Sequence, residues 1–194
     1  MITAVKYALR NLANFAGRDN RPTFWWFVLA IYLLTIVLSF VLVIPATGSL
    51  ILEGMHQAQT NAAPEAVSAA MQARMEGMMH ATIWVSIGTS LLMIALIAAA
   101  FVRRLHDAGL PGWVAIVPLA INLAMLARMP GQVDRALAAM KAGTTTASAG
   151  IYSTPGAGLD LLLGWAPTLI VAGLALLPST DGPNRYGEEP DDLA

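Results

Sequence analysis

The sequence predicts an all-α integral membrane protein, a helical bundle with about four transmembrane helices in a single domain of 194 residues. Three observations support this fold class. The composition is 57% apolar and only 12% charged. The mean hydropathy of +0.63 exceeds what a water-soluble domain needs. Several uncharged runs reach about 20 residues, which is the length that crosses a hydrocarbon core of roughly 30 Å as a helix.

Four apolar stretches are the expected spans, at about residues 24–44, 81–102, 111–127 and 161–178. The first is too long for a cleaved signal peptide, whose apolar region has about 7 to 15 residues. The third is the least regular, because Pro111 and Gly112 stand at its start and Pro118 lies inside it. We therefore expect the third span to be short, bent or partly buried.

The segment before the second span predicts an amphipathic helix at residues 64–80, begun by Pro64 and Glu65. Its methionines recur at spacings of three and four: Met71, Met75, Met78 and Met79. Together with His56 and His80, thioethers are suitable ligands for a soft ion such as Cu(I). A methionine stripe more often packs on lipid or on a neighbouring helix, so we favour packing and expect no metal site.

Residues 128–158 separate the third and fourth spans and are predicted to be an inserted loop. Residues 132–141 have the composition of a short helix. The run "AGTTTASAGIYSTPGAG" that follows is small and polar, as flexible connections are.

The distribution of Lys and Arg predicts which side of the membrane each end occupies. Four basic residues precede the first span: Lys6, Arg10, Arg18 and Arg21. Residues 45–80 carry only Arg74, and Arg103 and Arg104 follow the second span. Because short loops rich in Lys and Arg stay cytoplasmic, both termini of a four-span chain are expected in the cytoplasm. Three basic residues oppose this pattern: Arg128, Arg135 and Lys141. A re-entrant third span would move everything after it to the other side.

Enzyme motifs are missing from the sequence. The chain has no cysteine, which excludes disulfides and thiolate metal sites. Neither a Gly-rich phosphate loop nor an HExxH or GxSxG pattern is present. We therefore expect no catalytic residue, no cofactor, no metal and no nucleic-acid partner.

Three polar stretches border the apolar runs: "FAGRDNRPTFWW", "RRLHDAGLPGW" and "DGPNRYGEEP". In the four-span topology all three lie at the cytoplasmic face and form a basic and aromatic collar. The candidate interface, lipid or structural cluster consists of Arg18, Arg21, Trp25, Arg103, Arg104, His106, Asp107, Trp113, Asn184, Arg185 and Tyr186.

The collar has a structural and a chemical interpretation. A charged Asp107 beside the membrane needs a counter-charge, from Arg103 one turn back or from an arginine of another stretch; Asp181 is a second acid that can pair in this way. Alternatively, His106 and Asp107 belong to a proton relay or an anion site. Adjacent helical residues point to different faces, so these two are not expected to bond each other. We favour the structural role.

In identity and order, "GRDNRPTFWWF", "RRLHDAGLPGW" and "NRYGEEP" resemble the domain of unknown function 805 family of small bacterial inner-membrane proteins. The resemblance covers most of the chain and implies an inner-membrane location without a settled activity. The matching positions are Gly17, Arg18, Arg21, Phe24, Trp25, Arg103, Arg104, Leu105, His106, Asp107, Gly112, Trp113, Asn184, Arg185, Tyr186, Gly187 and Pro190. The chain departs from the family at residues 128–160, where relatives have a single compact apolar segment.

Two functions fit this sequence. The favoured one is a non-enzymatic membrane module whose collar binds a partner protein, a second copy or anionic lipid. Small residues in the second and fourth spans permit close helix contacts: Gly88, Ser90, Gly164 and Gly173. The alternative is a small transporter or channel component, in which the arginines attract an anionic solute and His106 responds to pH. Carriers usually need ionisable groups deep in the membrane, and these apolar runs contain none.

Overall fold

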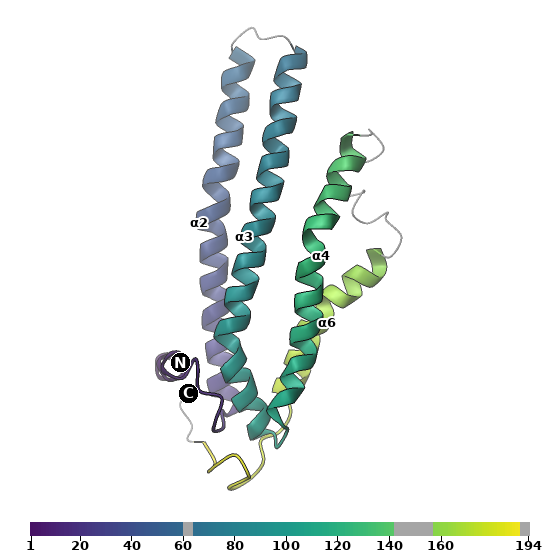
Figure 1. The fold of residues 1–194 in the computed structure, drawn as a ribbon. Helices are drawn as coiled ribbons and strands as arrows, with labels where there is room; N and C mark the ends of the chain where they lie inside the picture. The colour runs from purple at the N-terminus through teal and green to yellow at the C-terminus, as the bar shows by residue number, and fades with distance from the viewer. Residues whose placement is uncertain (60–63, 142–156, 191–194) are drawn as a thin grey trace. The chain divides into compact units, whose positions relative to one another are not determined.

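The computed structural model describes residues 1–59, 64–141 and 157–190, and most of these residues lie in helices and none in a named strand (Figure 1). The elements are α1 (Ile2–Arg10), α2 (Arg21–Gln59), α3 (Pro64–Asp107), the 3-10 helix η1 (Gly112–Ala115), α4 (Ile116–Lys141) and α6 (Ala157–Ala175). The prediction of an all-α protein is confirmed.

Within the described residues, three helical segments are long and apolar enough to cross a membrane: Arg21–Leu42, Val67–Asp107 and Gly112–Ala139. The apolar part of α6, Leu161–Ala175, is shorter. Several such helices indicate a multi-pass membrane protein. The third of the expected spans is therefore long enough to cross, whereas the fourth is the shortest.

The first two membrane helices are much longer than a bilayer requires. At about 1.5 Å per residue, the 39 residues of α2 extend about 58 Å and the 44 residues of α3 about 66 Å. The first span was expected to end at residue 44, but α2 continues through Pro45 to Gln59. A proline removes one backbone hydrogen bond, and the residues on both sides keep the others. As predicted, the Met-rich helix runs directly into the second span.

The expected loop at residues 128–158 requires a correction. Helix α4 continues to Lys141, so residues 128–141 are helical although Pro130 and Gly131 stand among them. The short helix expected at residues 132–141 is therefore present, as the end of α4 and not as a separate element. The side chains of Val133, Ala136 and Leu137 are buried, and this apolar burial offsets the hydrogen bond that Pro130 removes. Residues 142–156 lie outside the described part of the chain.

The chain divides into two compact units. The first unit contains residues 1–34, 90–127 and 156–194, and the second contains residues 35–89 and 128–155. In the first unit, four helices contribute to one apolar core, which consists of Ala8, Phe24, Phe27, Ile31, Ala100, Phe101, Leu105 and Ala175. This core brings the ends of α1, α2, α3 and α6 together, and these ends carry the polar stretches.

Among the described residues of the second unit, ion pairs whose side chains are exposed or half-exposed join α3 to α4. Lys141 Nζ lies 2.7 Å from Glu76 Oε1, and His80 Nε2 lies 3.8 Å from Asp134 Oδ1. A Cβ at Gly54 would lie 3.5 Å from the methyl carbon of Met71, which places this methionine against α2. At least Met71 of the methionine stripe therefore packs on a neighbouring helix.

Candidate functional site

The motif "RRLHDAGL" ends α3 with a glycine turn. Gly109 has φ +75°, a left-handed conformation that costs glycine little. Its amide donates to the His106 carbonyl at 3.0 Å, and the Leu110 amide donates to the Leu105 carbonyl at 2.9 Å. This pair of bonds is a Schellman motif, and Leu110 packs against the core that contains Leu105. The turn fixes where the charged residues of the last helical turn lie.

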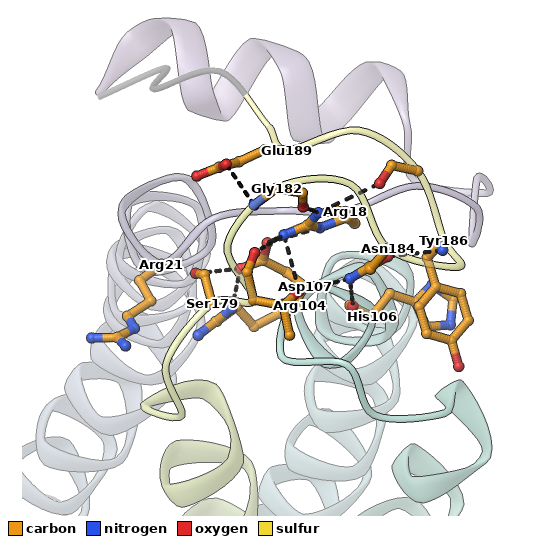
Figure 2. Close-up of polar contacts among 12 residues, drawn as sticks. Arg18, Arg21, Arg104, His106, Asp107, Ser179, Gly182, Asn184, Tyr186 and Glu189 are labelled. Carbon is orange, nitrogen blue, oxygen red and sulfur yellow. Dashed lines mark hydrogen bonds and ion pairs between the residues drawn. The ribbon is translucent and has the colours of Figure 1, made fainter.

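Asp107 is the centre of the site (Figure 2). One carboxylate oxygen accepts a hydrogen bond from Arg18 Nε at 3.1 Å. The other accepts from Ser179 Oγ at 2.6 Å and from Arg104 Nη1. The Asp107 carbonyl accepts from the Thr180 amide at 2.9 Å. Three separated stretches of the sequence therefore meet at one buried carboxylate, whose side chain is 0% exposed.

Two arginines carry these connections onward to backbone carbonyls. Arg18 donates to the carbonyls of Thr180 and Gly182, both at 2.6 Å. Arg104 donates through Nε to the Ala175 carbonyl at 3.0 Å and through Nη2 to the Leu177 carbonyl. Carbonyls at the end of α6 have no helical partner and carry a partial negative charge. Arg104 therefore caps α6 while it neutralises Asp107.

Arg103 forms a second buried pair with Asp19. Its Nε lies 3.0 Å from both carboxylate oxygens, and Nη1 donates to the carbonyls of Asn11 and Asn14. The Tyr7 ring centroid lies 5.8 Å from Arg103 Cζ. Burial raises the pKa of the Asp19 carboxyl above its ordinary value of 3.8, and the hydrogen bonds and charge of Arg103 oppose this rise. The Asp19 carboxylate thus depends on Arg103 for its charge.

The C-terminal motif "NRYG" contacts His106. The His106 and Tyr186 rings stack with centroids 3.8 Å apart and planes inclined by 6°, and His106 Nδ1 lies 3.2 Å from the Gly17 carbonyl. Asn184 Nδ2 donates to the His106 carbonyl at 3.0 Å, and Asn184 Oδ1 accepts from the Tyr186 amide at 2.8 Å. Stacking and hydrogen bonds thus hold "NRYG" against "RRLHD".

A family model described as "Protein of unknown function (DUF805)" matches residues 12–188. The chain belongs to the DUF805 family. This confirms the resemblance that the three motifs predicted. No curated protein matches the chain, and no solved structure matches it.

In this DUF805 chain, the structure brings most of the predicted cluster into contact. The residues that meet directly around Asp107 and His106 are Arg18, Arg104, His106, Asp107, Asn184 and Tyr186, with Arg185 over the Tyr186 ring at 4.6 Å. Arg21 is exposed and donates to the Leu177 carbonyl at 3.0 Å. Trp25 packs beside the core, whereas Trp113 is 66% exposed.

Sequence reasoning missed three participants: Asp19, Ser179 and Thr180. It also paired Asp107 with Arg103 as one option, whereas Arg104 and Arg18 hold Asp107 and Arg103 holds Asp19. Asp181, expected as a second pairing acid, is exposed. The argument used for Asp107 also applies to Asp19, because an acid next to the membrane needs a counter-charge. The sequence could therefore have predicted an arginine partner for Asp19.

The arrangement is suited to holding chain segments together. The side chains of Arg18, Arg103, Arg104, Asp19 and Asp107 are all 0–1% exposed. Their charges face one another and backbone carbonyls, so a solute or a lipid phosphate has no direct access to them. Among the residues that the structure describes, no group of three His, Cys, Asp or Glu side chains is placed to hold a metal ion. We use the name buried network for the five charged residues and the two hydroxyl residues that contact them: Arg18, Asp19, Arg103, Arg104, Asp107, Ser179 and Thr180.

Proposed function

We propose that this protein is a non-enzymatic, multi-pass module of the bacterial inner membrane, with both termini in the cytoplasm. The buried network fastens the ends of α2, α3 and α6, and the exposed rim of the collar binds anionic lipid headgroups. One observation carries this proposal: the motif arginines fall into two sets, a buried set that is ion-paired with carboxylates of the chain (Arg18, Arg103 and Arg104) and an exposed set (Arg21 and Arg185).

The buried set supports the fastening role. Each of its three guanidinium groups contacts a carboxylate and at least one backbone carbonyl from another segment. Planar guanidinium groups suit this use because they offer five donors in a fixed geometry. Removing one partner of such a buried pair leaves an uncompensated charge, so the segments are held cooperatively.

The exposed set supports lipid binding. Arg21 begins the first membrane helix, four residues before Trp25, and the exposed Trp113 follows the turn after α3. Arginine and tryptophan are the residue types that sit at headgroup level. Each basic residue near an anionic leaflet contributes about 1 kcal/mol. A carrier of anionic solutes has less support, because the three arginines at its proposed entrance are already bonded within the chain.

Lipid retained during purification tests the rim. The double substitution Arg21→Gln with Arg185→Gln is expected to lower the phosphatidylglycerol that co-purifies with the protein. The matched control, Arg74→Gln with Lys141→Gln, removes two exposed cations from the second unit and is expected to leave retention unchanged. Equal retention in both double variants would reject lipid binding by the rim.

Reporter fusions test the sidedness. A reporter after Ala194 is expected in the cytoplasm, and one inserted near Gln59 is expected in the periplasm. Opposite sides for Met1 and Ala194 would reject the four-span topology and separate "NRYGEEP" from the cytoplasmic face.

A further inference from the structure

We infer that α1 is an in-plane membrane helix, with Ile2 and Leu9 among the acyl chains and Lys6 and Arg10 at anionic headgroups. The DUF805 match begins at residue 12, after α1 ends at Arg10, so membership of the family does not imply this element. The inference rests on the proposed function only in placing anionic lipid at this face of the protein.

The surface of α1 divides into three sectors. Ala4 and Ala8 are 0% and 1% exposed, and Ala8 belongs to the core of the first unit. Ile2 and Leu9 are 66% and 47% exposed, and at 3.6 residues per turn a spacing of seven residues puts them on one side. Lys6 and Arg10 are exposed one turn apart, beside that apolar side. One helix thus presents a face packed on the protein, an exposed apolar face and a basic edge.

The length and attachment of α1 place it on the membrane rather than across it. Its nine residues extend about 14 Å, less than half of a hydrocarbon core of roughly 30 Å. Arg103 donates to the carbonyls of Asn11 and Asn14 and so holds them next to the end of α3. The first span begins soon afterwards, at Arg21. The exposed apolar side of α1 is therefore tethered at the level where the membrane helices end.

The apolar side of α1 and the basic edge beside it together indicate that α1 binds lipid. An apolar stripe bordered by Lys and Arg matches acyl chains bordered by phosphates, and interfacial helices bind anionic lipid through this combination. The orientation of α1 is fixed by the rest of the protein, because Arg103 Cζ lies 5.8 Å from the centroid of the Tyr7 ring. The α1 helix thus presents its lipid face in a fixed orientation instead of ordering on contact.

Site-directed fluorescence can locate each sector, because the chain has no cysteine. A polarity-sensitive fluorophore on Leu9→Cys, in the full-length protein within phosphatidylglycerol–phosphatidylcholine nanodiscs, is expected to show a blue-shifted emission and quenching by nitroxide-labelled lipid. The control is Thr3→Cys, an exposed position on the opposite side of the basic edge. Its probe is expected to show no blue shift and to be quenched by aqueous iodide.

The headgroup preference is read from the same probe on Leu9→Cys. Nitroxide-labelled phosphatidylglycerol is expected to quench it more than the same amount of labelled phosphatidylcholine. Each cation favours anionic lipid by roughly fivefold at low salt, or about 25-fold together. Lys6→Gln with Arg10→Gln is therefore expected to remove the difference, whereas Arg74→Gln with Lys141→Gln leaves it intact.

Three outcomes would overturn the inference: quenching of Leu9→Cys by iodide, shielding of Leu9→Cys from both iodide and lipid quenchers, or equal quenching by the two labelled lipids. The second outcome would indicate a protein partner or a second copy on α1. These outcomes are independent of the lipid retained by the Arg21→Gln, Arg185→Gln variant, so failure of the rim and failure of α1 are distinguishable.

Discussion

The two units of this protein use ion pairs in opposite ways. In the first unit, Arg18–Asp107 and Arg103–Asp19 are each 3.0 Å apart, and their side chains are 0–1% exposed. In the second unit, Lys141–Glu76 is closer, at 2.7 Å, but its side chains are 61% and 31% exposed. Exposed pairs contribute about 0–1 kcal/mol, whereas breaking a buried pair costs about 3–5 kcal/mol. The burial of an ion pair, and not its N–O distance, therefore determines how much the pair contributes to stability.

The difference has a direct physical cause. Water solvates the separated charges of an exposed pair nearly as well as the partner does. The buried carboxylate of Asp107 instead relies on Arg18, Arg104 and Ser179, and no water replaces a donor that is removed. Substitutions in the two units are thus expected to differ by several fold in effect, and the following four are ordered from the largest to the smallest.

Asp107→Asn is expected to have the largest effect. It leaves the buried charges of Arg18 and Arg104 without their shared carboxylate, and the free energy of unfolding should fall by about 3–5 kcal/mol. Reversible unfolding in mixed detergent micelles measures the loss. The exposed Asp181 provides the control, because Asp181→Asn should change stability by no more than about 0.5 kcal/mol. Equal stability of the two variants would contradict a network centred on Asp107.

Arg103→Lys keeps the positive charge and therefore the topology signal. It loses the contact of one guanidinium with Asp19 and with the carbonyls of Asn11 and Asn14. Charged hydrogen bonds of this kind contribute about 1.5–3 kcal/mol each, so we expect a loss of about 2–3 kcal/mol in the same unfolding assay. Arg21→Lys, at an exposed position, is the matched control. A loss in both variants, or in neither, would contradict the difference between buried and exposed arginines.

Gly112→Ala tests how tightly the turn closes on His106. The added Cβ would lie 2.8 Å from Val102 Cγ1 and 3.1 Å from His106 Nε2. Overpacking of this kind costs about 1–3 kcal/mol, measurable as a lower melting temperature in detergent. Gly164→Ala is the control in α6, since a Cβ there meets nothing within 4 Å. A Gly112→Ala protein as stable as the control would show that the side chains of Val102 and His106 are both free to move away.

Lys141→Gln is expected to have the smallest effect. The pair with Glu76 is largely exposed, so its loss should lower the free energy of unfolding by at most about 0.5 kcal/mol. The difference should vanish at high salt, which screens exposed charges. A salt-independent loss of several kcal/mol would place this pair in the same class as Arg18–Asp107.

The helices were predictable from apolar runs, but two of their ends were not. The first and third spans were expected to end at residues 44 and 127, but α2 continues through Pro45 and α4 continues through Pro130. A proline removes one hydrogen bond of many, so a long helix continues wherever packing repays that loss. Such packing, as for Leu137 of α4, depends on a neighbour far away in the sequence. Local signals therefore predict helical segments better than their limits.

The site was predictable in composition but not in pairing. Asp107 has arginines three and four residues before it, and both spacings permit a contact on a helix. The choice of Arg104 over Arg103 depends on Asp19, 84 residues from Arg103, which draws Arg103 toward the α1–α2 connection. Ser179 and Thr180 carried no charge and no motif of their own. Their role follows only from the position at which α6 ends.

A double-mutant cycle on Arg18 and Asp107 measures whether these two buried residues stabilise the protein as a pair. The cycle compares the free energies of unfolding of Arg18→Gln, Asp107→Asn, the double variant and the unsubstituted protein. Because these residues share one buried contact at 3.0 Å, we predict that the double variant loses less than the sum of the single variants, with a coupling of about 2–3 kcal/mol. The same cycle on Lys141 and Glu76 should give less than about 0.5 kcal/mol. Additive losses at Arg18 and Asp107 would contradict a buried network, because the two residues would then stabilise the protein separately.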